Sequence, residues 1–168
     1  MDMARHCCRM ARMATIDDVL AKEDGTAFAI ALSDLVFPRY DRDGFASLTP
    51  AERVAYCVDA LEREVNNGGF EQFFWNSSGD TAHETVEALE AIGAGQAAQM
   101  VREAMACFPG GAVAASRDNR EQALQSIGEA AREKWQALDG RFYEYPDDLT
   151  GLMRRYVERN RAGFRGWP

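Results

Sequence analysis

Apolar residues recur with the spacing of an α-helix along nearly the whole chain, and this feature constrains the fold most. Between residues 52 and 65 the apolar positions follow an i, i+3, i+4, i+7, i+11 pattern: Val54, Cys57, Val58, Leu61 and Val65. That spacing places them on one narrow stripe of a helix. No segment of useful length alternates between apolar and polar residues with the period of two expected of a half-buried strand. The sequence therefore predicts an all-α fold, a single-domain bundle of about seven helices.

The length of 168 residues fits one domain. We expect three parts: residues 1–14 as a disordered basic N-terminal tail, 15–160 as the helical domain, and 161–168 as a C-terminal tail.

Several residues predict where the first helices begin and end. Gly25 divides the first apolar stretch into two helices, and Pro38 with the Asp-Arg-Asp-Gly sequence after it predicts a turn. Thr49 and Glu52, with Pro50 between them, match a capping box with proline at the first helical position.

The stretch VNNGGFEQFFWNSSGD is the least ordinary part of the chain. We define the corner segment as residues 66–77 and expect a helix to stop at its first four residues, because Asn and Gly accept the left-handed conformation. Its members of interest are Asn66, Asn67, Gly68, Gly69, Phe70, Phe73, Phe74, Asn76 and Ser77. Asp80 follows and is expected to cap the next helix.

Two interpretations of the corner segment stay open. In the first, its Asn and Ser side chains satisfy helix-end backbone groups while its aromatic side chains are buried. In the second, Asn67, Phe73 and Asn76 belong to a pocket for a small molecule or a substrate. We favour the first, because both polar clusters lie where helices must end.

Negative charge is concentrated in the middle of the chain. The formal net charge is −8, and residues 65–100 contain five acidic residues and no Lys or Arg. Direct nucleic-acid binding is not expected, because it requires cations placed against phosphates. In the expected helix after residue 80, four acids share one side: Asp80, Glu84, Glu87 and Glu90. Asp59 and Glu62 extend this acidic row if the preceding helix lies alongside, together with Asp41, Asp43 and Glu52. The alternative is an ordinary solvated helix face.

Arginines near the C-terminus are the main cations that could neutralise the acidic row. They are Arg154, Arg155, Arg159, Arg161 and Arg165.

Signatures of catalysis and of cofactor or metal binding are missing from the sequence. No phosphate-binding loop, dinucleotide fingerprint, nucleophile elbow or zinc-protease motif occurs. His6-Cys7-Cys8 lacks a second ligand pair at zinc spacing. We therefore expect no enzyme, no cofactor and no metal. No apolar run approaches the ~20 residues of a membrane-spanning helix, so we expect no membrane partner, and four cysteines fit a reducing cytoplasm.

The chain resembles the DNA mimic protein nineteen family over about residues 45–160. The resemblance lies in VNNGGFEQFFWNSSG, ALEAIGA, the Phe-Pro at 108–109, ALDGRFYEYPDDL and the Leu-x-x-x-Tyr end at 152–156. It implies an acidic, all-helical homodimer that occupies the DNA-binding face of a helix-turn-helix regulator and relieves repression.

Three functional hypotheses follow. The first is a protein-binding module that imitates DNA phosphates and so occupies a basic DNA-binding protein. The second is an interaction or immunity-like module without DNA mimicry. The third is an enzyme or small-molecule binder that uses the corner segment.

Overall fold

The computed structural model describes residues 14–165, which contain eight α-helices, four short 3₁₀ helices and no strand. The α-helices are α1 (Ile16–Leu20), α2 (Gly25–Asp43), α3 (Pro50–Trp75), α4 (Ala82–Ile92), α5 (Gly95–Met105), α6 (Arg117–Ser126), α7 (Glu129–Tyr143) and α8 (Leu149–Arg159). The 3₁₀ helices are η1 (Phe45–Ser47), η2 (Ser77–Thr81), η3 (Pro109–Gly111) and η4 (Arg161–Gly163). The predicted all-α class is confirmed.

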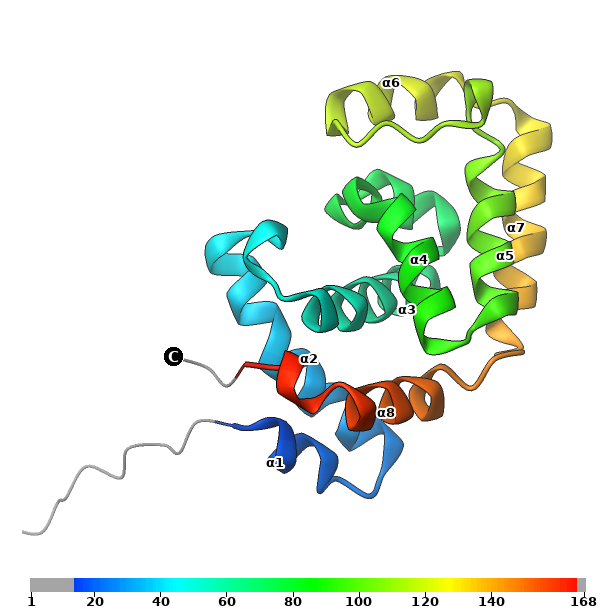
Figure 1. The fold of residues 1–168 in the computed structure, drawn as a ribbon. Coiled ribbons are helices and arrows are strands. Elements are labelled where there is room, and N and C mark those ends of the chain that lie inside the picture. The colour runs from blue at the N-terminus through cyan, green and yellow to red at the C-terminus, as the bar shows by residue number, and fades with distance from the viewer. Residues whose placement is uncertain (1–13, 166–168) are drawn as a thin grey trace, which may run out of the picture.

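Helix α3 is the centre of the molecule and packs against α2, α4, α7 and η2 (Figure 1). At one end of the molecule α5 and α7 lie side by side, with α6 across their ends; at the other end α2 packs against α1 and α8. The apolar stripe of α3 predicted from the sequence faces this interior, with Leu61 and Val65 fully buried.

The first helices begin where the sequence predicts, but α2 ends later than predicted. Thr49 and Glu52 form the predicted capping box at the start of α3. The turn predicted to start at Pro38 is wrong there, because α2 continues through this residue to Asp43; the helix ends at Gly44, the last residue of the predicted Asp-Arg-Asp-Gly turn. Pro38 cannot donate a backbone hydrogen bond, but Val36 and Arg39 on either side of it are buried. Packing of this turn against the core therefore outweighs the missing bond.

The structure describes most of the predicted C-terminal tail but only the last residue of the predicted N-terminal tail. Residues 1–13, which include His6 and all but the last residue of the N-terminal tail, lie outside the described residues. Residues 161–165 continue the packed fold, since η4 occupies Arg161–Gly163 and Phe164 is buried.

Candidate functional site

The corner segment bends α3 at its two glycines. Gly68 and Gly69 have non-helical backbone angles, and Gly69 adopts φ = 75°. Beyond the bend, the backbone N–H of Phe70 donates to Oδ1 of Asp139 on α7 at 2.8 Å. Asp139 thus caps the second half of α3 from a different helix. A Cβ on Gly69 would lie 2.3 Å from Oδ2 of Asp139, so this capping contact requires glycine.

The aromatic side chains of the corner segment form part of the core. Phe70, Phe73 and Phe74 are fully buried, and the ring of Phe74 lies 4.9 Å from that of Phe108 and 5.4 Å from that of Trp135. These rings already contact other side chains on all sides and offer no open surface for a ligand to stack on.

The polar side chains of the corner segment serve nearby groups or face solvent. The amide of Asn76 donates to Glu64 at 2.7 Å, and that of Asn66 donates to the hydroxyl of Tyr145 at 2.5 Å. Asn67 and Ser77 are exposed. The buried aromatic rings agree with the structural interpretation of this segment. Its polar half differs, because Asn66 and Asn76 bond other side chains and it is the hydroxyl of Ser78 that donates to a helix-end carbonyl, that of Phe73.

Arg120 on α6 completes the corner and was not singled out from the sequence. Its side chain is fully buried and donates to the carbonyl oxygens of Phe74 and Asn76, at 2.6 and 3.1 Å, at the end of α3. It also donates to the carbonyls of Ala114 and Ala115. The sequence signal was its position four residues before Leu124, on the buried side of α6.

The acidic row is neutralised at both ends. Asp80 does not cap α4: it lies in η2, and its carboxylate pairs with Arg120 at 2.6 Å. Glu90 pairs with Arg102 of α5. Glu84 and Glu87 are exposed and form no ion pair within residues 14–165. The expectation of four unpaired acids is therefore corrected to two, which we call the α4 acid pair.

Arg53 of α3 lines a depression with Glu84 and Glu87, and Arg102, which pairs with Glu90, lines another with Glu87. Nη2 of Arg53 donates to the carbonyl of Ala46 at 2.9 Å, and the guanidinium carbon of Arg53 lies 5.2 Å from the centre of the Phe45 ring. Arg53 is thus engaged with the loop before α3, while the α4 acid pair stays open to solvent.

Asp59 and Glu62 do not continue the acidic row. They line a depression between α2 and α3 that also contains Asp34, whereas Glu84 and Glu87 share a depression with Cys57. Cys57 and Glu62 are five residues apart, about 140° around α3 at 100° per residue. The predicted partner-binding acids therefore belong to two separate surfaces.

Burial disfavours the ionised form of the Asp59 carboxylate. Desolvation raises its pKa to about 6; the charge of Arg63 opposes this shift and that of Glu62 adds to it. Desolvation also raises the pKa of Glu62, against a hydrogen bond from Tyr145. The folded protein thus binds a proton at Asp59 more tightly than the unfolded chain, and stability from this group falls as pH rises from about 4 to about 6.

Replacing Asp59 by Asn should raise the free energy of unfolding at pH 7.5 by about 1 kcal/mol and leave it unchanged at pH 4. This gain is smaller than complete burial would give, because 32% of the Asp59 side chain is exposed and solvent screens its charge. Urea unfolding followed by circular dichroism, in dilute protein across this pH range, measures the difference. Glu133→Gln, on the exposed side of α7, is the control; equal stabilities of Asp59→Asn and wild type at pH 7.5 would contradict the assignment.

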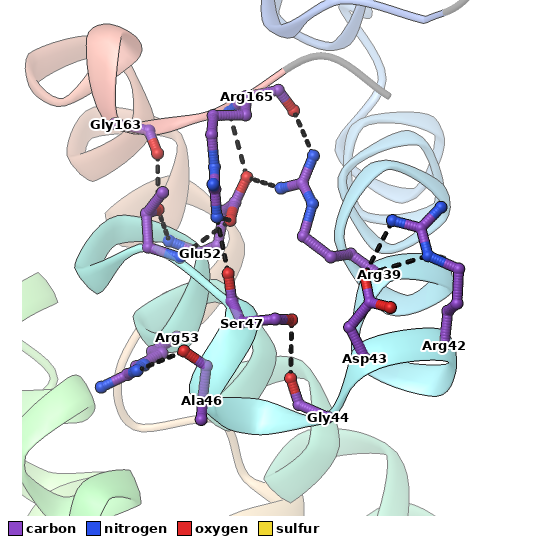
Figure 2. A network of polar contacts seen from close by, with 11 residues as sticks. Arg39, Arg42, Asp43, Gly44, Ala46, Ser47, Glu52, Arg53, Gly163 and Arg165 are labelled. Carbon is purple, nitrogen blue, oxygen red and sulfur yellow. Dashed lines mark hydrogen bonds and ion pairs between the residues drawn. The ribbon is translucent and has the colours of Figure 1, made fainter. Parts of the chain in front are cut away.

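Glu52, expected to extend the acidic row, is buried instead (Figure 2). Its carboxylate pairs with the buried guanidinium of Arg39 and accepts the backbone N–H groups of Thr49 and Arg165 at 2.9 and 3.0 Å. Desolvation alone would raise the pKa of Glu52, but these hydrogen bonds hold it below its usual value. The network ties α2, the start of α3 and the C-terminal segment together.

Three of the C-terminal arginines, Arg154, Arg161 and Arg165, form hydrogen bonds or ion pairs, and none of these contacts is with Asp80, Glu84, Glu87 or Glu90. Arg165 lies 3.6 Å from Glu52, and Arg161 pairs with Asp17 at 3.1 Å. Arg154 donates to the carbonyls of Leu20 and Lys22. The cations that do neutralise acids of the row, Arg102 and Arg120, come from α5 and α6.

Within residues 14–165, no group of three or more His, Cys, Asp or Glu side chains is arranged to hold a metal ion. No helix in this range combines the length and the apolar character needed to cross a lipid bilayer. The sequence pattern at His6-Cys7-Cys8 falls outside this range.

The fold and these surfaces define an all-α domain with a filled aromatic corner and two separate acidic surfaces. The chain belongs to the family of DMP19-like proteins, whose model matches residues 46–160. This match confirms the family resemblance seen in the sequence. No curated protein and no solved structure gives a significant match.

Proposed function

We propose that this chain is a non-enzymatic module that binds a basic protein surface, and that the surface is one with which a DNA-binding protein, such as a transcription regulator, contacts phosphates. The observation that carries the proposal is the α4 acid pair. Glu84 and Glu87 are exposed, form no ion pair among the described residues, and lie in a stretch from residue 65 to 100 that contains no Lys or Arg.

The cost of this arrangement supports a binding role. Like charges at neighbouring positions on a helix cost about 0.2–0.5 kcal/mol per pair, and α4 carries this cost without a Lys or Arg of its own. Arg and Lys side chains placed against phosphates would relieve it on binding. Glu84 and Glu87 are about 4.5 Å apart along the helix axis, comparable with the rise of about 3.4 Å along the duplex axis for each phosphate of one DNA strand.

Membership of the DMP19-like family supports the same proposal, since the resemblance implies acidic proteins that occupy DNA-binding faces. The small-molecule hypothesis gains no support from the corner segment, because its phenylalanines are packed in the core. Binding through the α4 acid pair should be fast and should weaken steeply with salt, since charge complementarity acts mainly on the association rate and is screened.

Reversing both charges, in Glu84→Lys/Glu87→Lys, should reduce partner affinity at least 100-fold and leave the helical circular dichroism spectrum unchanged. Each of the two contacts changes from attraction to repulsion. The measurement is affinity capture from native lysate with elution by increasing salt, identification of partners by mass, and determination of the dissociation constant with the purified partner. Duplex DNA is added as a competitor.

A matched control is Glu133→Lys/Glu144→Lys, which changes the net charge equally on exposed positions of α7 and just beyond it. It should keep the partner. A DNA-binding protein that is lost only with the α4 variant and is displaced by DNA supports the proposal. A partner held in high salt, and retained by the α4 variant, would instead identify an interaction module without DNA mimicry.

A further inference from the structure

The apolar stripe of α3 is incompletely covered at its N-terminal end. Cys57 and Val65 are buried, but Val54, the first residue of the stripe, is only half-buried. Val54 lines a depression together with Phe45 of η1, which is also half-buried, and Pro50, which is exposed. Water therefore reaches apolar side chains here, although the pattern of the helix is that of a core-facing stripe.

This depression lies between the start of α3 and α4. The α4 side is lined by the buried Ala88, the exposed Ala91 and the α4 acid pair. We call it the α3–α4 depression; the residues that line it lie between 45 and 57 and between 84 and 91. Its volume of about 350 Å³ is at the lower end of the range of about 300–1,000 Å³ found for ligand sites. A space of this size suits one or two side chains better than a large cofactor.

Arg53 lines the same depression but leaves its acids unpaired. In Figure 2 the Arg53 side chain extends away from the network around Glu52 and donates to the carbonyl of Ala46. Nε of Arg53 is buried and has no hydrogen-bond partner among the described residues. Because buried donors without a partner are rare, the depression presents an unsatisfied donor as well as two unpaired carboxylates. A bound protein segment can supply a backbone carbonyl to the former and cations to the latter.

The lining of the depression restricts the chemistry of its occupant. A cation without apolar groups would leave the apolar lining in contact with water, and an apolar group alone would strip water from the carboxylates without pairing them. An apolar side chain flanked by Arg or Lys avoids both costs. It covers the lining, while the cations form charge-assisted hydrogen bonds with Glu84 and Glu87.

We propose that the α3–α4 depression receives an apolar side chain of the partner, next to the basic side chains that contact Glu84 and Glu87. This inference rests on the proposed function, because it adds an apolar contact to the same partner surface. The charges then act mainly on the rate of association, whereas the apolar contact slows dissociation and selects among basic partners. Part of the partner affinity should therefore persist when salt screens the charges.

Benzamidine is a suitable probe, because it joins an aromatic ring to a flat amidinium cation that resembles the guanidinium group of arginine. Acetamidine, which carries the same cation without the ring, is the matched compound. Binding to the full chain is followed by amide shifts in ¹H–¹⁵N NMR spectra. We expect benzamidine to bind at least five-fold more tightly than acetamidine, with the largest shifts at Val54, Ala88 and Ala91.

Two kinds of variant test the apolar and the charged half of the site. Ala91→Trp fills the depression and should weaken benzamidine at least five-fold, whereas Ala137→Trp, at an exposed position of α7, should not. Glu84→Gln/Glu87→Gln should also weaken benzamidine at least five-fold. Equal dissociation constants for benzamidine and acetamidine would overturn the inference. Benzamidine binding that ignores either Ala91→Trp or Glu84→Gln/Glu87→Gln would do the same.

The tryptophan variants also separate this inference from the proposed function. Ala91→Trp should weaken binding of the purified partner at least ten-fold without changing the slope of affinity against salt, because it alters no charge. Ala137→Trp should bind the partner like wild type. A partner that is lost with Glu84→Lys/Glu87→Lys but binds Ala91→Trp as tightly as wild type supports the proposed function and overturns the inference. Retention by both variants overturns both.

Discussion

Replacing Glu52 by Ala should lower the free energy of unfolding by about 3–5 kcal/mol, the usual cost of removing one member of a buried ion pair. The variant takes from Arg39 the carboxylate with which it pairs and leaves the N–H groups of Thr49 and Arg165 without their acceptor (Figure 2). Urea unfolding at pH 7 measures the loss.

The effect of Glu52→Ala has a defined pH dependence. The pKa of Glu52 is lowered in the folded state, so its contribution is fully present above its ordinary value of 4.5 and is lost as pH falls through the lowered folded value. The difference between wild type and variant should therefore shrink in acid. This direction is opposite to that expected for Asp59.

Two further variants separate a buried pair from an ordinary surface one. Glu90→Ala breaks an exposed pair with Arg102 and should change stability by no more than about 0.5 kcal/mol. Arg39→Met/Glu52→Leu removes both charges and should recover at least about 1 kcal/mol relative to Glu52→Ala. Equal decreases in the free energy of unfolding for Glu52→Ala and Glu90→Ala would show that the network around Glu52 does not hold the C-terminal segment against α2 and α3.

Replacing Arg120 by Met should also destabilise the protein by about 4 kcal/mol, because buried carbonyls left without donors cost about 1–3 kcal/mol each. Met keeps an unbranched apolar stem but donates none of the five hydrogen bonds that Arg120 makes. The carbonyls of Phe74 and Asn76 at the end of α3 are the most affected. Thermal and urea unfolding followed by circular dichroism measure the loss.

The control for Arg120→Met is Arg117→Met on the same helix. Arg117 is exposed and, among residues 14–165, pairs with Glu121 alone, four residues further along α6, so its replacement should cost about 0.5 kcal/mol or less. Arg120→Lys should lie between the two, since one ammonium group cannot donate to all the acceptors arranged around the edges of the guanidinium group. A loss from Arg120→Met as small as that from Arg117→Met would contradict its role at this corner.

The helical periodicity and the helix signals of the sequence predicted most of the fold. The capping box at Thr49 and Glu52 and the break at Gly69 are local features, since each depends on residues within one or two helical turns. Pro38 shows the limit of such signals: its local preference for a turn is real, but the burial of Val36 and Arg39 on either side is decided by distant segments.

The surface charges were harder to predict than the helices. Asp80 pairs with an arginine 40 residues away in sequence, and Glu90 with one 12 residues away, so no pattern within a helix shows that they are neutralised. The capping box predicts that Glu52 contacts the backbone of Thr49. It does not predict that Glu52 is buried, which follows from the approach of Arg39 and Arg165. Glu84 and Glu87 are exposed because the basic side chains near them, Arg53 and Arg102, are engaged with other groups and form no ion pair with them among the described residues.

The contact between Asp139 and the backbone of Phe70 has a consequence for how the chain reaches its native state. The two residues are 69 positions apart, so the second half of α3 cannot acquire its N-terminal cap until α7 has been made and has docked. A fragment that ends before α7 will hold the first half of α3 but not its bend. During synthesis the cap on the second half of α3 therefore forms only after α7 has been made.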